Sequence, residues 1–373
     1  MSEWKECKLG EVAIVRGGKR LSKGKMLTAL PTNHPYIRIT DFSGHKILLD
    51  AIQYVDNEIQ KSIAKYTVDA GDLVISIVGT LGLCAIIPIE LDKANLTENC
   101  AKIHIKEDNV EKLFLYYHLI SPETQDTIVG FDVGSTQPKL PLYNVQNISL
   151  LLPPLPAQRA IAGVLSSLDD KVDLLHRQNK TLEAMAETLW RKMFVEEADP
   201  GWKKGKLGDI TSVSTGKGLK RIEYNENGLY PVIGANGEIG RTDKYLTNEK
   251  LILTGRVGTL GEILISNKEV WISDNVLIIK PNENRFFYAV YFLLKNIDFE
   301  NLNVGSTQPL VTQTDLKNIE IEFPSNGILD YFTTWCESAF NKIEQNVSQI
   351  HTLSRLRDNL LPKLMSGEVR VRI

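Results

Sequence analysis

The amino-acid sequence predicts an α+β fold in which two β-rich α/β domains are joined by two long helices. The helices are expected to form an intramolecular antiparallel coiled coil, so that the chain is a pseudo-twofold tandem repeat. Three observations predict this fold: the hexapeptide VGSTQP occurs at 133–138 and again at 304–309, β-branched runs fill the front of each copy, and heptads fill the back. Self-similarity of this kind indicates that one structural unit was duplicated.

The repeat extends well beyond the hexapeptide. WKECKLGEV from Trp4 matches WKKGKLGDI from Trp202, an offset of 198, and VGTLG occurs at 78–82 and 257–261, an offset of 179. From the hexapeptide onward the offset stays at 171. The front of the first copy therefore carries 27 more residues than the front of the second. This difference is typical of length-variable loops on a fixed support.

The front of each copy is expected to be mainly β-structure. Runs rich in β-branched residues and bounded by Gly, Asn or Asp predict strands: DLVISIVG (72–79), LCAIIPI (83–89), KLILTGRVG (250–258) and VLIIK (276–280). One apolar and aromatic run in each copy, KLFLYYHLI (112–120) and FFYAVYFLL (286–294), predicts a buried helix.

The back of each copy is expected to be one long helix, because apolar residues alternate steps of four and three, which is a heptad seam of period 3.5. LLPPLP (151–156) should exclude helix before the first seam, and ADPG (198–201) should end it. The two seams, related by the offset of 171, are Ile161, Leu165, Leu168, Val172, Leu175, Asn179, Leu182, Ala186, Leu189 and Met193, and Phe332, Cys336, Ala339, Ile343, Asn346, Ile350, Leu353, Arg357, Leu360 and Leu364.

Each seam contains one asparagine, and the two do not occupy equivalent positions. A buried asparagine without a partner costs on the order of 1–3 kcal/mol. If the helices pair antiparallel about a twofold near position 177, Asn179 lies opposite Asn346. We therefore hypothesise an Asn–Asn layer that sets the register of the coiled coil. The alternative is two helices that pack separately, each on its own domain.

These features divide the chain into four expected segments: a β-rich domain over 1–152, a helical spacer over 153–198, a second β-rich domain over 199–324 and a second helical spacer over 325–373. The composition, 43% hydrophobic and 24% charged, is that of an ordinary globular protein. No apolar run approaches the roughly 20 residues that a membrane helix needs. The start has no signal-peptide core, so a cytoplasmic protein with no membrane partner is expected. The four cysteines lack CxxC spacing, which argues against a zinc cluster or a disulfide framework.

Motifs that would carry catalysis are missing from the sequence. It contains no GxxxxGK[ST] phosphate loop, no GxGxxG after a strand, no Asn-Pro-Pro-aromatic tetrapeptide, no GxSxG and no HExxH. The six histidines have no metal-ligand spacing. Asp169 and Asp170, in LDDK, are expected on a solvated helix face rather than in a nuclease cluster. We therefore expect no catalytic residue, no metal site and no cofactor in this chain.

Basic residues recur at like positions after the opening strand of each copy, and the whole chain has a formal net charge of −3. A recurring cationic loop indicates a common polyanionic ligand, and the alternative is ordinary solvated charge. The DNA-binding candidates in these loops are Arg16, Lys19, Arg20, Lys23 and Lys25 in the first copy and Lys217, Lys220 and Arg221 in the second.

Four further DNA-binding candidates lie outside the basic loops: Arg38, Lys139, Arg241 and Arg256. Lys139 follows the first hexapeptide only. Arg256 precedes the second VGTLG where Ile77 precedes the first, and this difference suits either different base readout or a local packing difference. The hexapeptide itself is expected to be a turn that locks the β-rich and helical parts together, with direct DNA contact as the alternative.

With these residues in place, the chain resembles the specificity subunit of Type I restriction–modification systems. The resemblance covers nearly the whole length and rests on the two WK…KLG openings, the duplicated VGTLG and VGSTQP, ISLLLPPLPAQRAIAGVLSSLDDKVD (148–173) and LRDNLLPKLMSGEVRV (356–371). Two departures are Ala157, where the family often has Glu, and FPSNGILDYF (323–332), which replaces the proline-rich lead in the second copy.

The resemblance implies two target-recognition domains, each reading half of a split, asymmetric sequence in double-stranded DNA, with the paired helices as a ruler. A helix over 157–195 would be about 58 Å long, enough to hold two domains roughly 34 Å, one DNA turn, apart. It also implies that two methyltransferase (M) subunits using S-adenosylmethionine, and restriction (R) subunits using ATP and Mg, carry the catalysis. The alternatives are a stand-alone DNA methyltransferase or nuclease, or a protein-binding scaffold.

Overall fold

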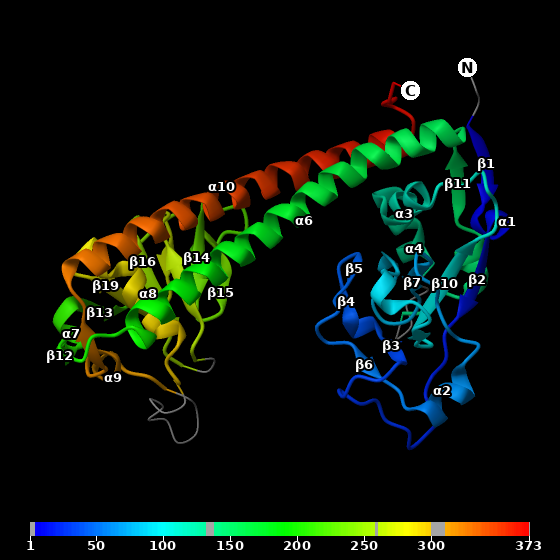
Figure 1. The fold of residues 1–373 in the computed structure, drawn as a ribbon. Coiled ribbons are helices and arrows are strands. Elements are labelled where there is room, and N and C mark those ends of the chain that lie inside the picture. Colours follow the sequence, from blue (N-terminus) through cyan, green and yellow to red (C-terminus); the bar gives the residue numbers. More distant parts are fainter. Residues whose placement is uncertain (1–3, 132–137, 258–259, 300–309, 373) are drawn as a thin grey trace. The chain divides into compact units, whose positions relative to one another are not determined.

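The computed structural model describes residues 4–131, 138–257, 260–299 and 310–372. The chain forms two compact units (Figure 1). Unit 1 comprises Met1–Leu174 and Gln349–Ile373, and unit 2 comprises Leu175–Ser348. Two long helices, α6 (Leu155–Arg191) and α10 (Asn326–Met365), contribute residues to both units.

The centre of unit 1 is a four-stranded antiparallel sheet with the order β2-β10-β7-β8. Every residue of β7 is buried, which explains its run of three apolar residues before Ser76. The buried helix α3 packs with this sheet in one apolar core. The bounds are β2 (Ala13–Gly17), β7 (Leu73–Ser76), β8 (Cys84–Ile86), β10 (Cys100–Ile105) and α3 (Lys112–Ile120).

The centre of unit 2 repeats this arrangement with the order β13-β19-β16-β17 and the buried helix α8. The four predicted strands and the two predicted helices are thus confirmed. Because strand order and direction agree in the two units, the front of each copy has the same fold despite the 27-residue difference in length. The bounds are β13 (Thr211–Thr215), β16 (Leu251–Gly255), β17 (Ile263–Ser266), β19 (Val276–Pro281) and α8 (Phe287–Lys295).

Two smaller sheets also occur in both units. A mixed three-stranded sheet contains one antiparallel and one parallel pair, in the order β6-β3-β9 in unit 1 and β15-β14-β18 in unit 2. A two-stranded sheet pairs the opening strand of each copy with the strand before its long helix, as β1-β11 and β12-β20. The bounds are β1 (Lys5–Lys8), β3 (Pro35–Ile37), β6 (Gln53–Tyr54), β9 (Asn95–Leu96), β11 (Ser149–Leu152), β12 (Lys203–Lys206), β14 (Tyr230–Gly234), β15 (Gly237–Thr242), β18 (Trp271–Ile272) and β20 (Glu320–Phe323).

Short helices complete both units: α1 (Leu9–Val12), α2 (Asn57–Ile63), α4 (Pro122–Gly130), α5 (Leu142–Gln146), α7 (Leu207–Ile210), α9 (Gln313–Lys317), the 3-10 turns η1 (Ile39–Asp41), η2 (Ile89–Leu91), η4 (Arg221–Glu223) and η5 (Asn284–Phe286), and the π-helical turn η3 (Lys192–Glu196).

Part of the additional length of the first copy forms the hairpin β4 (Phe42–Ser43) and β5 (Lys46–Ile47). The hairpin reaches α6, because Lys46 forms an ion pair with Asp173. The hydroxyl of Tyr116, from α3, donates to the carbonyl of His45 at 3.2 Å. The insertion therefore braces the domain against its helix.

In unit 2 the long helices pack antiparallel. Asn346 Nδ2 donates to Asn179 Oδ1 at 2.7 Å, and the rings of Phe194 and Phe332 lie 5.1 Å apart. From Asn179 on to Phe194 along α6 and η3, the contacts move back from Asn346 to Phe332 along α10, so the two helices run in opposite directions. The predicted Asn179–Asn346 contact is confirmed, and the alternative of two helices that pack separately does not fit it. Asn346 is completely buried and also donates to Gln178 Oε1 at 2.9 Å.

In unit 1 the helices meet through Asp169 and Arg357, whose closest atoms lie 2.7 Å apart. Burial disfavours the charge of Arg357, but hydrogen bonds to Asp169 and Asp358 outweigh it and raise its pKa. The expectation that Asp169 lies on a solvated face is wrong, because its side chain is only 18% exposed and it binds both Arg357 and Tyr117. Asp170 is exposed, as expected.

The start of α6 differs slightly from the expectation. The helix begins at Leu155, inside the LLPPLP segment that was expected to be non-helical, and includes Pro156. Proline is tolerated in the first turn of a helix, where its missing N–H has no intrahelical acceptor. Over the described ranges, no helix combines the length and the apolarity that crossing a membrane requires.

Candidate nucleic-acid interface

The basic loop leaves the central sheet in the same way in both units. After β2, the amide of Lys19 donates to the carbonyl of Leu96 at 2.8 Å, and after β13 the amide of Lys217 donates to Ile272 at 2.8 Å. The preceding residues, Gly18 and Gly216, lie so close to this neighbouring backbone that a Cβ atom at either position would overlap carbonyl oxygens. Glycine is therefore required there. Both lysines are exposed.

The five candidates of the first copy are all exposed, with Arg16 inside β2 and the other four in the loop after it. Several of them have acidic or aromatic neighbours. Lys25 Nζ lies 3.6 Å from Glu58, and Arg20 forms an ion pair with Glu98. Burial opposes ionisation of Glu98, but hydrogen bonds, first that from Arg20, outweigh it and lower the pKa. The part of the chain that the structure describes provides no ion-pair partner for Arg16, Lys19 or Lys23.

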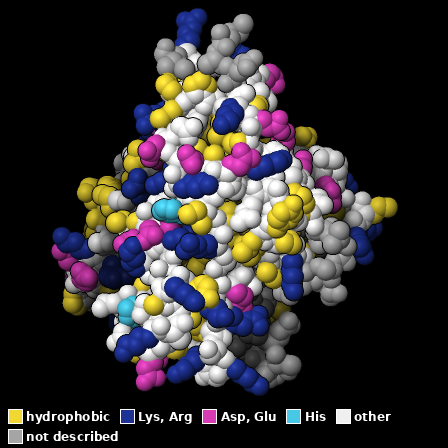
Figure 2. Space-filling view, turned by 90° about the vertical axis from the view of Figure 1, so that its right-hand side faces the viewer, with side chains coloured by type: hydrophobic (Ala, Val, Ile, Leu, Met, Phe, Trp, Pro, Cys, Tyr) yellow, Lys and Arg dark blue, Asp and Glu magenta, His cyan; other side chains and the backbone are white. Residues whose placement is uncertain are grey.

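Figure 2 looks onto a face of unit 1 and shows Lys and Arg side chains gathered in the lower part of the view, with few acidic side chains among them. One residue pair near the first basic loop was not predicted. The ring of Tyr66 lies near two cations, with Lys19 Nζ 5.8 Å and Lys65 Nζ 5.5 Å from its centroid. These residues lie in the part of the first copy that has no counterpart of equal length, so the repeat could not reveal them.

The three candidates in the second loop, Lys217, Lys220 and Arg221, are also exposed. A side-chain hydrogen bond fixes the start of this loop, because Trp271 Nε1 donates to the carbonyl of Lys217 at 2.8 Å. The carboxylate of Glu223 accepts from the amide of Lys220 and lies 2.7 Å from Lys244 Nζ. Hydrogen bonds first from Lys244 and then from Lys220 lower the pKa of Glu223. The backbone is thus fixed while the cationic side chains point outward.

Arg38 and Arg241 are engaged within the protein. The guanidinium of Arg38 donates to both oxygens of Asp41, to Gln53 and to the carbonyl of Ala51, at 2.6–3.2 Å. Arg241 donates to the carbonyls of Gly228 and Leu229 at 2.7 and 2.8 Å, and to Glu238 at 3.1 Å. These contacts favour a role in bracing loops for both arginines, rather than readout of a ligand.

The two repeated motifs meet each other. Leu140, two residues after the first hexapeptide, donates its amide to the carbonyl of Ile77 at 2.8 Å, and Val311 donates to Arg256 at 3.0 Å in the second copy. The residues 133–137 and 304–309 lie outside the described residues. The residue two positions after each hexapeptide is therefore bonded to the residue before a VGTLG segment. The turn that was expected to lock the β-rich and helical parts together lies outside the described residues and stays a prediction. Lys139 is exposed beside this junction.

Ile77 and Arg256 occupy equivalent backbone positions with different side-chain environments. Their amides donate to Asn99 and Asn275 respectively. Ile77 is part of the apolar core of unit 1, whereas Arg256 is half-buried and its Nε atom has no acceptor among the described residues. The position thus provides a polar group in one unit and an apolar group in the other.

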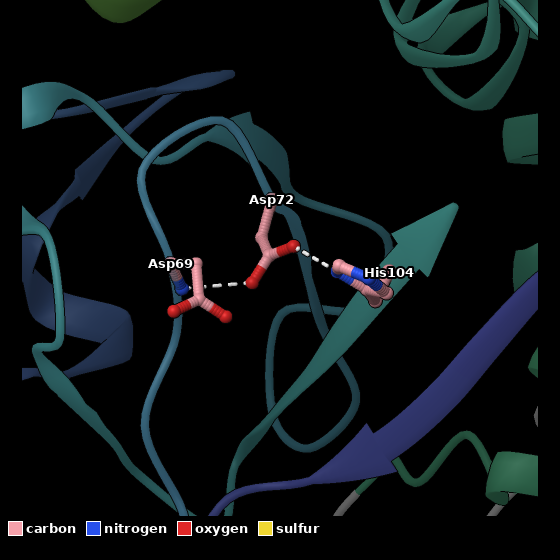
Figure 3. Close-up of side chains that lie close together, drawn as sticks. All are labelled: Asp69, Asp72 and His104. Carbon is pink, nitrogen blue, oxygen red and sulfur yellow. Dashed lines mark hydrogen bonds and ion pairs between the residues drawn. The ribbon is translucent and has the colours of Figure 1, made fainter. Parts of the chain in front are cut away.

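One acidic cluster lies outside the basic loops (Figure 3). Asp69, Asp72 and His104 lie close together, and His104 Nδ1 is 2.7 Å from Asp72. Lys102 Nζ lies 3.1 Å from both carboxylates, and Lys93 binds Asp69. The bonds from Lys93 and then Lys102 lower the pKa of Asp69. The two lysines neutralise the carboxylates, so this group is an ion-pair network rather than a cation site.

Comparison with known proteins gives one consistent result. The curated Type I restriction enzyme MjaIX specificity subunit of Methanocaldococcus jannaschii is 27% identical over 415 positions, covering 99% of this chain and 94% of the relative. The HindI specificity subunit of Haemophilus influenzae is 22% identical, covering 99% of this chain and 100% of that relative. A crystal structure of the Type I restriction–modification S subunit from M. genitalium shares the fold, with a TM-score of 0.65, 19% identity and coverage of 98% and 96%.

The family model for the Type I restriction modification DNA specificity domain matches residues 1–184 and again 200–345. The two matched segments correspond to the two copies of the repeat, and together they cover most of the chain. The chain therefore belongs to the Type I restriction–modification DNA specificity family.

Proposed function

We propose that this chain is the non-catalytic DNA-recognition subunit of a Type I restriction–modification complex. Each β-rich domain reads one half of a bipartite, asymmetric site in double-stranded DNA. The observation that carries the proposal is the exposed basic loop, which leaves equivalent sheets through the same Gly–Lys turn in both units. Equivalent phosphate-binding lysines in two domains with different neighbouring side chains suit a protein that grips DNA twice and reads two unlike sequences.

The proposed layout has recognition domains at 1–152 and 199–324 and helical spacers at 153–198 and 325–373. The helices form a coiled coil that acts as the ruler between half-sites. Support comes from the antiparallel packing of the helices in unit 2, through Asn179 with Asn346 and Phe194 with Phe332, and from the contact of Asp169 with Arg357 in unit 1.

Two methyltransferase subunits are proposed to dock on the helices. Met185 on α6 is 51% exposed in a groove of about 790 Å³ that also contains Tyr331 and Trp335, all in unit 2. The residue of α10 at the position equivalent to Met185 is Leu356 in unit 1, which is 45% exposed. Exposed apolar surface on a helix indicates a protein interface. The exposed apolar side chain recurs at this one equivalent position, which suits two identical partners.

Catalysis is assigned to those partners. The methyltransferase subunits would use S-adenosylmethionine, and restriction subunits that join them would use ATP and Mg. A cytoplasmic location follows from action on chromosomal and invading DNA. The one acidic cluster described above is neutralised by lysines and gives no support to a stand-alone nuclease.

The proposal is tested with the chain assembled with its methyltransferase subunits. The double variant Lys19→Ala/Lys217→Ala should bind double-stranded DNA more weakly, and the slope of log affinity against log salt should decrease by about one for each phosphate that is no longer neutralised. The matched control is Lys5→Ala/Lys203→Ala, which alters exposed lysines at equivalent positions of β1 and β12. Equal salt slopes for both variants would contradict the assignment of the interface.

A second experiment tests the bipartite reading. Methylated adenines are mapped in the genome of a cell that produces the complex. The expected motif has two unlike halves separated by a spacer of fixed length. A continuous or palindromic motif would overturn the proposal that two different domains each read one half.

A further inference from the structure

A polar group in unit 1 lies where α3, α6 and α10 meet. The hydroxyl of Tyr117, on α3, donates to Asp169 Oδ2 at 2.7 Å, and Arg357 Nη1 donates to Asp169 Oδ1 at 2.7 Å. Tyr117 is almost completely buried, and Asp169 and Arg357 are largely shielded from solvent. We call Tyr117, Asp169 and Arg357 the polar triad.

The equivalent positions of unit 2 are all apolar. The offset of 171 relates Asp169 to Phe340 and Ala186 to Arg357, and the alignment of α3 with α8 relates Tyr117 to Phe292. The contacts are preserved although the chemistry has changed, since the rings of Phe292 and Phe340 lie 6.3 Å apart and Ala186 is completely buried. The two units therefore differ at all three equivalent positions. The three side chains are all polar in unit 1 and all apolar in unit 2.

Each long helix provides the charged partner that the other needs, Asp169 on α6 and Arg357 on α10. Antiparallel pairing of α6 with α6 of a second copy would place Asp169 beside Ala186 and remove Arg357. Pairing of α10 with α10 of a second copy would place Arg357 beside Phe340 and remove Asp169. Asp169 would lose its arginine, and Arg357 would keep only its neighbour Asp358. A shielded charge that loses a partner is unfavourable, whereas the matched arrangement satisfies both charges.

We propose that the polar triad selects the partner helix: it makes α6 pair with α10 and disfavours pairing of either helix with a second copy of itself. Asp169 is the selecting group on α6 and Arg357 is the selecting group on α10. Tyr117 orients the carboxylate through its hydrogen bond. Because a symmetric duplication starts with identical helices, a device of this kind favours the intramolecular pair over association of two chains.

The test uses two full-length chains that carry different affinity tags. Asp169→Arg alone and Arg357→Asp alone each put like charges where α6 and α10 meet within one chain. When the two variants are produced together, α6 of each chain can pair with α10 of the other, and both contacts again join opposite charges. The mixture should therefore co-purify and shift from the mass of one chain to that of two in light scattering, whereas the wild-type chain and the double variant Asp169→Arg/Arg357→Asp should remain monomeric.

The control repeats the experiment at exposed positions of the same helices, with Asp170→Arg and Arg355→Asp. The proposal is overturned if the test mixture forms no more dimer than this control mixture. It is also overturned if the double variant has a urea midpoint no higher than those of the two single variants, because restored charge complementarity would then have no effect. Poor solubility of a single variant leaves the first comparison intact, because that comparison is judged on the charge-complementary mixture.

Discussion

The asparagine layer predicts opposite consequences for two substitutions that remove the same hydrogen bond. Asn346 is completely buried, and its Nδ2 donates to Asn179 at 2.7 Å and to Gln178 at 2.9 Å. Its Oδ1 is buried and has no hydrogen-bond partner among the described residues. Asn179 is only half-buried, so water can reach its side chain. The two members of the pair therefore carry different costs.

Replacing Asn179 by Leu leaves one buried N–H of Asn346 without an acceptor. The cost of such a group is about 1–3 kcal/mol, and the modest additional apolar burial at a half-exposed position recovers part of it. We expect the free energy of unfolding to fall by about 1–2 kcal/mol. Replacing Asn346 by Leu instead removes two hydrogen bonds, worth about 1 kcal/mol each, but also removes the unpaired carbonyl and buries a new apolar side chain. We expect that variant to lie within about 1 kcal/mol of the wild type or to be more stable.

The assay is urea unfolding followed by tryptophan fluorescence. Four of the five tryptophans, Trp190, Trp202, Trp271 and Trp335, belong to unit 2, so the signal reports mainly on the unit that contains the asparagine layer. The double variant Asn179→Leu/Asn346→Leu should recover the stability lost in Asn179→Leu. The reasoning fails if Asn346→Leu is the more damaging single change, since the buried carbonyl would then have a partner whose loss matters.

Two further predictions concern unit 1. Gly18→Ala should reduce the free energy of unfolding by about 1–3 kcal/mol, because the added methyl overlaps neighbouring carbonyls. Gly163→Ala, in α6 with open space around it, should raise the free energy of unfolding by about 1 kcal/mol. Equal effects of the two substitutions in thermal unfolding would disprove the close approach at Gly18. Burial lowers the pKa of His118 from 6.5 to about 4, so between these values the unfolded chain binds a proton that the folded chain does not. The free energy of unfolding should therefore fall by roughly 3 kcal/mol as the pH drops through this window. His118→Gln should flatten the profile, and an unchanged profile in urea unfolding at several pH values would rule out this histidine as its source.

Much of the fold could be predicted because a repeated sequence carries two kinds of information at once. Periodicity within each copy distinguished strands from helices. The constant offset behind the hexapeptide then related the two seams, which is why the contact of Asn179 with Asn346 followed from position alone. The LLPPLP boundary was placed slightly too late because proline excludes the helix interior but not its first turn.

The site was harder to predict, because a charged residue in a loop says nothing about which acceptors the fold brings to it. Arg38 and Arg241 were grouped with the exposed lysines, yet besides the nearby Asp41 and Glu238 they bond Gln53 and the turn at Gly228, 15 and 13 residues away respectively. The solvated face assigned to Asp169 was wrong for the same reason, since its partner Arg357 is 188 residues away. Local sequence therefore predicts the exposure of a charged residue well only where the fold brings no partner to it from a distant part of the chain.

The hairpin β4–β5 limits how the recognition domains can be exchanged between proteins. It occurs in the first copy, and Lys46, the first residue of β5, binds Asp173 on α6. The hydroxyl of Tyr116 donates to His45 in the turn of the hairpin. A graft that replaced the first domain with the shorter second one would leave Asp173 on α6 without the ion pair to Lys46. Swapped domains would therefore have to bring the hairpin with them, or a compensating change at Asp173. New specificities should thus be acquired more freely in the second half of the chain than in the first.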